Sequence, residues 1–173
     1  DTDMKRTTKT ATKTGEILWA PWRSGYVLAP KSRGCFLCDA LKPGSPSLVF
    51  RGRRAFVTMN IFPYTNGHLM VVPVRHVGDI RRLTPAEERE IARLVRLSTR
   101  VLTDVLHPHG MNIGMNIGRC AGAGLTTHLH VHIVPRWDGD TNFMPVIAGA
   151  KVMPQSLDEL RTALVRAFRQ QTR

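Results

Sequence analysis

The sequence contains no long hydrophobic run. Its longest apolar runs, such as residues 69–72, are far too short to cross a bilayer, because a helix needs about 20 consecutive apolar residues to do so. No apolar segment of the kind found in signal peptides follows the N-terminus. These two absences predict a cytoplasmic protein that has no membrane partner.

Cysteine is also scarce. Cys35 and Cys38 form a Cys-Phe-Leu-Cys pair, and Cys120 stands alone. An odd count with one close pair argues against a disulfide framework. A Cys-x-x-Cys turn can place two thiolates on a tetrahedral zinc ion, but the chain has no second such pair. Two reduced structural thiols therefore remain the alternative at this point.

Acidic residues are few: 13 Asp and Glu face 25 Lys and Arg, which gives a formal charge of +12. Such a balance favours polyanionic partners, including nucleotides, polyphosphate and nucleic acid, without choosing among them. A solvated basic surface is an equal alternative. Residues 1–17 are polar and basic without periodicity, which predicts a disordered arm, and residues 18–173 suit a single domain.

Histidine, by contrast, is concentrated in one place. Residues 128–134 alternate histidine with apolar side chains, and this period of two predicts a β-strand that Pro135 ends, because proline has no N–H to donate. The imidazoles of His128, His130 and His132 would share one face. A row of imidazoles can bind a metal ion, act on a phosphate ester or form a polar surface without a role.

The loop before this strand helps to choose between these alternatives. Residues 116–124 read Asn-Ile-Gly-Arg-Cys-Ala-Gly-Ala-Gly, and glycines let backbone N–H groups approach and cradle an anion. An anion cradle beside imidazoles indicates phosphate chemistry more than a bare zinc hydrolase.

The remaining pattern predicts an α+β fold with an antiparallel sheet. Strands are expected at residues 48–51, 55–59, 68–73 and 111–117. Thr84-Pro-Ala-Glu87 is a capping box that opens a helix at residues 85–106, and a second helix should run from Ser156 to about Gln170. Short turns between the strands favour antiparallel pairing.

The histidine row also carries a resemblance. His-Leu-His-Val-His-Ile-Val matches the motif of the histidine triad (HIT) family. Residues 121–124, 136–137 and 139–143 resemble the branch that includes bacterial diadenosine tetraphosphate phosphorylases and hydrolases, and the likeness covers residues 18–157. It implies a HIT-like sheet with one long and one C-terminal helix, paired in a homodimer.

The resemblance also implies an activity. It is that of a nucleotidyl transferase or hydrolase that cleaves dinucleoside polyphosphates through a nucleotidyl-histidine, with phosphate or water as the acceptor. The implied catalytic histidines are the nucleophile His130, the hydrogen-bond donor His132, and His128. The implied substrate-binding residues are Asn60, His68, Asn116, Gly118, Gly122 and Gly124.

Two further details follow from the family pattern. Many HIT hydrolases carry Gln four residues before the first triad histidine, whereas Gly124 stands here, as in the phosphorylase branch. This difference slightly favours phosphate over water as the acceptor. The resemblance also implies a structural zinc ion, with no part in the chemistry, whose ligands would be Cys35, Cys38, His76 and His128.

Three other functions stay open from the sequence. The chain could be a zinc-stabilised nucleotide-binding regulatory protein without turnover, a hydrolase with zinc on the triad histidines, or a single-stranded nucleic-acid binder. The expected partner is a nucleotide rather than nucleic acid.

Overall fold

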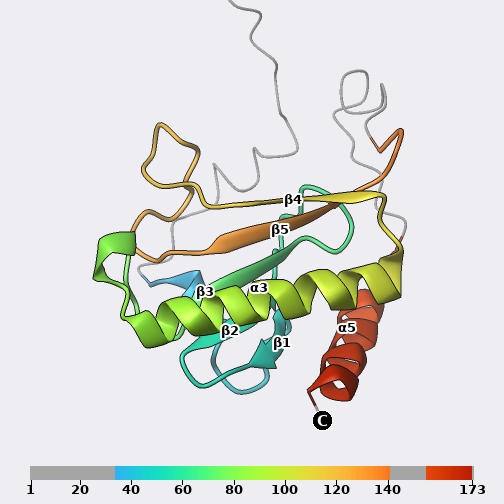
Figure 1. Ribbon diagram of the computed structural model, residues 1–173, viewed down its shortest axis with the longest axis horizontal. Coiled ribbons are helices and arrows are strands. Elements are labelled where there is room, and N and C mark those ends of the chain that lie inside the picture. The colour runs from blue at the N-terminus through green and yellow to red at the C-terminus, as the bar shows by residue number, and fades with distance from the viewer. Residues whose placement is uncertain (1–33, 141–154, 173) are drawn as a thin grey trace, which may run out of the picture.

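The computed structural model describes residues 34–140 and 155–172 (Figure 1). The predicted arm at residues 1–17 lies outside the described residues. Five strands form one antiparallel sheet in the order β1-β2-β3-β5-β4. Their bounds are β1 Leu48–Arg51, β2 Ala55–Met59, β3 Leu69–Pro73, β4 Gly110–Gly114 and β5 Val131–Arg136. The predicted α+β fold with an antiparallel sheet is confirmed.

Two long helices form a layer on one face of this sheet (Figure 1). They are α3, Pro85–Leu106, and α5, Leu157–Gln171; the short α2, Phe36–Asp39, and the 3-10 helix η2, Ile80–Arg82, complete the described elements. The capping box at the start of α3 is present: Thr84 Oγ1 accepts from Glu87 N, and the Glu87 carboxylate accepts from Thr84 N. Local capping therefore sets the start of α3 where the sequence predicts it.

The two faces of the sheet have separate hydrophobic clusters. Strand residues such as Val71 and Ile133 pack with Leu94 of α3 and Phe168 of α5. On the opposite face Phe56, Met70 and Val72 pack with Leu37 of α2. Because neighbouring residues of a strand point to opposite faces, the sheet is covered by helices on one side and carries α2 on the other.

The last strand differs from its prediction at both ends. β5 begins at Val131 rather than His128. If the register of β3 with β5 continued beyond Val131, His130 would face Val72 and Leu129 would face Pro73, which has no N–H to donate. The Leu129 N–H bonds instead to the Val77 carbonyl at 2.8 Å. Pro135 does not end the strand. It pairs with Met111 of β4 and lies beyond the residues paired with β3, so its missing N–H removes no bond there.

Two other strands are shorter than expected: β4 ends at Gly114 rather than residue 117, and β3 begins at Leu69 rather than His68. Neither change moves a chemistry-bearing side chain to the other face. No helix among the residues that the structure describes is long and apolar enough to cross a membrane.

Candidate active site and metal-binding group

The triad histidines lie on the sheet face opposite the helical layer. His132 is the cross-strand partner of Met70, which belongs to the cluster on the α2 side. His128 and His130 are buried just before β5, and His132 is half-buried at its second position. The rings of His130 and His132 meet edge to face, with centroids 4.8 Å apart. The structure therefore brings these two imidazoles together.

A backbone contact fixes the proton of His130. Its Nδ1 lies 2.9 Å from the carbonyl oxygen of His128. A carbonyl can only accept a hydrogen bond, so Nδ1 must carry the hydrogen. In the neutral ring the other nitrogen, Nε2, is then left with a lone pair, which is the state that a nucleophile needs.

A second backbone contact fixes the protons of two more histidines. The Tyr64 N–H donates to His68 Nδ1 at 3.0 Å, so the hydrogen of the neutral His68 ring sits on Nε2. His68 Nε2 lies 2.9 Å from His132 Nδ1 and donates to it. His132 therefore carries its own hydrogen on Nε2 and can donate it outward.

Burial keeps His132 neutral. Burial, followed by the smaller effect of the neighbouring His130, lowers the pKa of His132 from 6.5 to about 4. Near pH 7 this ring is therefore an uncharged hydrogen-bond donor beside the lone pair of His130.

Asn60 belongs to the same hydrogen-bonded group. Its Nδ2 lies 3.3 Å from His68 Nδ1, and its Oδ1 accepts from the Phe62 N–H at 2.9 Å. The Tyr64 ring covers His68 and His132, with centroid distances of 4.6 and 5.8 Å. Tyr64 is a residue that the sequence interpretation missed, since nothing in its spacing marks it as a neighbour of the triad.

The glycine loop is present, but two of its backbone N–H groups bond to carbonyls of the loop itself. Gly118 and Gly122 have φ values of +88° and +86°, which favour glycine. The Gly122 N–H bonds to the Arg119 carbonyl at 3.0 Å, and the Ala123 N–H bonds to the Gly118 carbonyl at 3.2 Å. These two amides thus stabilise the turn itself, and the predicted anion cradle is left with the other groups, Asn116 and the N–H groups of Gly118 and Gly124.

A separate group gathers two thiols and two imidazoles. The ligand atoms of Cys35, Cys38, His76 and His128 all lie within 4.8 Å of one another. Nδ1 of His128 lies 3.3 Å from the sulfur of Cys35 and 3.6 Å from that of Cys38, and Nδ1 of His76 lies 3.3 Å from Cys38. The sequence-predicted ligands therefore meet, and together they could hold one metal ion.

The lone pair of His128 is placed to bind a cation, and a bound cation would change the protonation of the thiols. His128 Nε2 lies 2.9 Å from the Pro73 carbonyl and donates to it, which turns the Nδ1 lone pair toward the thiols. Burial, and then the hydrogen bond and charge of Cys35, raise the pKa of Cys38 to about 11. A cation between the thiols would reverse this preference and favour thiolates.

The loop that carries His76 is fixed from both sides. Arg75 donates from Nε and Nη2 to the two carboxylate oxygens of the buried Glu87, at 2.9 and 2.8 Å. On the other side a Cβ at Gly78 would lie 2.6 Å from the Thr126 carbonyl oxygen, so only glycine fits there. The sequence shows Glu87 only as a helix cap and gives no sign of its contact with Arg75.

The fold and the histidine row together define a class of protein. Residues 45–139 match the HIT domain, and the chain belongs to that family. The chain is 39% identical over 170 residues to the AP-4-A phosphorylase of Mycobacterium tuberculosis, which covers 89% of this chain and 85% of that protein. The predicted HIT resemblance is confirmed.

More distant relatives and two solved structures also resemble this chain. The asymmetrical bis(5'-nucleosyl)-tetraphosphatase of Schizosaccharomyces pombe is 33% identical over 98 residues, 57% of this chain and 53% of that protein. A zinc-bound histidine triad family protein from Mycobacterium smegmatis covers 80% of this chain and 96% of its own, with a TM-score of 0.64 at 24% identity. A histidine triad protein from Sulfolobus tokodaii gives 0.67, also at 24% identity, over 80% and 95%. These two structures share the fold.

Proposed function

We propose that this chain is a HIT-type enzyme that cleaves dinucleoside polyphosphates such as diadenosine tetraphosphate. The observation that carries the proposal is the pair of fixed tautomers. A lone pair on His130 Nε2 stands beside an N–H on His132 Nε2, and both follow from backbone contacts. The similarity to AP-4-A phosphorylase and to a bis(5'-nucleosyl)-tetraphosphatase supports the substrate class.

The reaction would proceed in two displacements at the α-phosphorus. In the first, His130 Nε2 forms a P–N bond while the P–O bond to the rest of the polyphosphate breaks, giving a nucleotidyl-histidine. The N–H of His132 would donate to a phosphoryl or leaving-group oxygen and stabilise the charge that develops there. In the second, an acceptor oxygen attacks phosphorus, the P–N bond breaks and His130 recovers its lone pair.

Phosphate is the acceptor we propose. The support is the 39% identity to a protein named phosphorylase and the presence of Gly124 where many HIT hydrolases carry Gln. Water would use the same covalent intermediate, so the acceptor depends on what the site holds next to phosphorus during the second displacement.

Product analysis tests both parts of the proposal. The chain is incubated with diadenosine tetraphosphate with and without inorganic phosphate, and the nucleotides are separated. We expect ADP plus ATP, formed only with phosphate. AMP plus ATP would keep the α-phosphorus attack and replace phosphate by water. Two ADP, or bound substrate without any product, would contradict the proposed displacement.

We also propose that the Cys₂His₂ group holds one structural zinc ion. Two ligands of a tetrahedral zinc, bound at about 2.0 Å through nitrogen and 2.3 Å through sulfur, lie about 3.5 Å apart. Three of the sulfur–nitrogen distances in the group, those of His128 to Cys35 and Cys38 and of His76 to Cys38, are 3.3 to 3.6 Å and fit this value. Four protein ligands leave no open position, so the ion would hold the loops of Cys35, His76 and His128 together and take no part in the displacement.

A further inference from the structure

The outer side of the helical layer carries a row of arginines. On α3 Arg89, Arg93, Arg96 and Arg100 follow one another at spacings of four, three and four residues, which places them on one stripe of the helix. With a rise of 1.5 Å per residue the row is about 16 Å long. All four side chains are exposed, and so are Arg166 and Arg169 on α5.

Few carboxylates offset this charge. Residues 91–103 and 160–172 contain no Asp or Glu. Arg93 has one long contact of 3.4 Å with Glu90, whose carboxylate is already engaged by the N–H groups of Arg53 and Arg54. Within the described part of the chain, Arg96 and Arg100 make no ion pair. The arginines are therefore available to a partner.

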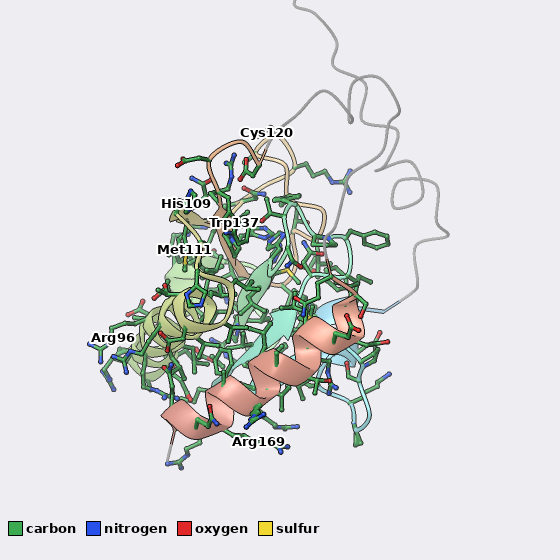
Figure 2. The ribbon with its side chains drawn as sticks, turned by 90° about the vertical axis from the view of Figure 1, so that its right-hand side faces the viewer. Arg96, His109, Met111, Cys120, Trp137 and Arg169 are labelled. Atoms are coloured by element: carbon green, nitrogen blue, oxygen red, sulfur yellow. The ribbon has the colours of Figure 1, made fainter. Side chains whose placement is uncertain are left out.

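The row lies on the wrong face of the sheet to serve the active site. Val131 and Ile133 of β5 point into the cluster under α3, whereas His132, between them, points to the opposite face. In Figure 2 Arg96 and Arg169 extend from the helical layer, far from Cys120 in the loop that precedes the triad. A nucleotide held by the triad cannot reach these arginines, so the substrate does not account for them.

We propose that the outer surface of α3 and α5 binds the phosphate backbone of a nucleic-acid duplex without reading its bases. All basic residues of both helices are arginine, whose planar guanidinium pairs with phosphate oxygens in two parallel hydrogen bonds. The sequence pattern made nucleotide, rather than nucleic acid, the expected partner. The segregation of this charge from the triad is what only the structure shows.

The same surface fits other polyanions less well. Helices that lie on membranes insert an apolar face between the lipids, but the apolar face of α3 is buried against the sheet. Proteins that hold single strands stack bases on aromatic side chains. The two helices contain one aromatic residue, Phe168, and it is fully buried. A duplex, which presents only phosphates and closed grooves to such a surface, remains the best match.

The test measures binding of the full chain to a fluorescent 20-base-pair duplex across a salt series. The variant Arg93→Gln/Arg96→Gln/Arg100→Gln removes three charges from the row and keeps helix-forming side chains. The matched control Arg53→Gln/Arg54→Gln/Arg81→Gln removes three exposed arginines that lie outside α3 and α5. We expect the row variant to weaken binding at least tenfold and to reduce the slope of log K against log salt by about 3.

The control should weaken binding less than threefold, and diadenosine tetraphosphate turnover should be unchanged in the row variant. Equal losses in the two variants would show that net charge alone is responsible, and would overturn the proposal. So would binding to anionic phospholipid vesicles or to an unstructured single strand that is tighter than binding to the duplex, or no binding to any of the three.

Discussion

At the scale of single residues, the N–H of Tyr64 decides the protonation of two imidazoles. It can only donate, so it fixes His68 as the Nε2–H tautomer, and His68 in turn fixes His132. Without this contact the outward nitrogen of His132 could equally be an acceptor, which would repel an oxygen on phosphorus. We therefore propose that His68 is a positioning residue that acts through His132.

Replacements of His68 should show whether its hydrogen bond to His132 contributes to turnover. His68→Ala leaves His132 free to take either tautomer. We expect kcat to fall about a hundredfold with a small change in KM, at the lower end of the range for general acid catalysis. His68→Gln can still donate from its amide to His132 Nδ1 and should recover part of the loss. Equal kcat values in the two variants would show that the hydrogen bond to His132 has no effect. Steady-state kinetics with diadenosine tetraphosphate measures both.

His130 is the second residue whose replacement is decisive. His130→Asn should lower turnover about a thousandfold or more, because no other lone pair is fixed at the same place. The variant should still bind the nucleotide, since the glycine loop and Asn60 are unchanged. His109→Asn, a change at an exposed histidine directly before β4, is the control and should keep full turnover. Turnover near wild type in His130→Asn would remove the covalent mechanism.

At the scale of elements, Glu87 joins the start of α3 to the loop that carries His76. Its carboxylate accepts from Arg75, Thr84 N and Thr84 Oγ1 while only 4% of the residue is exposed. These hydrogen bonds, with that from Arg75 the largest cause, lower the pKa of Glu87 from 4.5 to about 2. The contact therefore links a helix cap to the metal-binding group.

The pH dependence of this link follows from the sign of the shift. A carboxyl whose pKa is lower in the folded state stabilises the fold fully above pH 4.5, and the contribution is lost as the pH falls toward 2. Glu87→Gln should lower the free energy of unfolding by about 2 kcal/mol at pH 7, and the difference from wild type should shrink below pH 4.5. Urea denaturation at several pH values measures it.

The exposed neighbour Glu88 provides the control for that experiment. Glu88→Gln should change the free energy of unfolding by less than about 0.5 kcal/mol, as surface substitutions usually do. A similar loss in both variants would assign the effect to the helix dipole rather than to Arg75.

The metal-binding group should behave as a structural element. Cys35→Ser/Cys38→Ser should lower the zinc content from about one ion per chain to near zero and should lower the melting temperature. Turnover should slow without a change in the bond that is cleaved, because the proposed ion would hold the loop of His128 rather than the phosphate. Cys120→Ser, outside the group, is the control and should keep the metal. Chelation that stops turnover at once and leaves the melting temperature unchanged would make the metal catalytic.

At the scale of the whole molecule, β4 is one of the two edge strands of the described sheet, the other being β1. It pairs only with β5 among the described strands, and Ile113 and the nearby Ile117 are 47% and 50% exposed. Unpaired edges with apolar side chains favour pairing with another chain. The apolar faces of α3 and α5 are buried in the core of the same chain, so they are not available to a second chain.

We therefore propose that the homodimer forms through the β4 edge. Light scattering should give twice the chain mass of 19.4 kDa. Ile113→Glu should shift the protein to a monomer, because it would bury a charge at the centre of the contact. Ile80→Glu, an exposed isoleucine in η2 away from this edge, is the matched control. Wild-type protein that is monomeric at high concentration would exclude this interface.

The sequence by itself determined the features that rest on nearby residues. The start of α3 follows from Thr84 and Glu87, three residues apart. The alternation of residues 128–134 predicts β5 and its two faces, although the strand begins only at Val131. The resemblance to the HIT family also rests on residues 128–134. Such features depend on contacts within one turn or one strand, so the spacing of residues along the chain is enough to predict them.

Only the tertiary structure decided which protons and lone pairs face the substrate. The contact of His68 with His132 spans 64 residues, and that of Cys35 with His128 spans 93. Pro73 of β3 moves the start of β5, and the sheet separates the arginine row from the triad. No spacing in the sequence encodes these relations, because they arise when strands distant in the chain pair side by side and expose their residues to opposite faces.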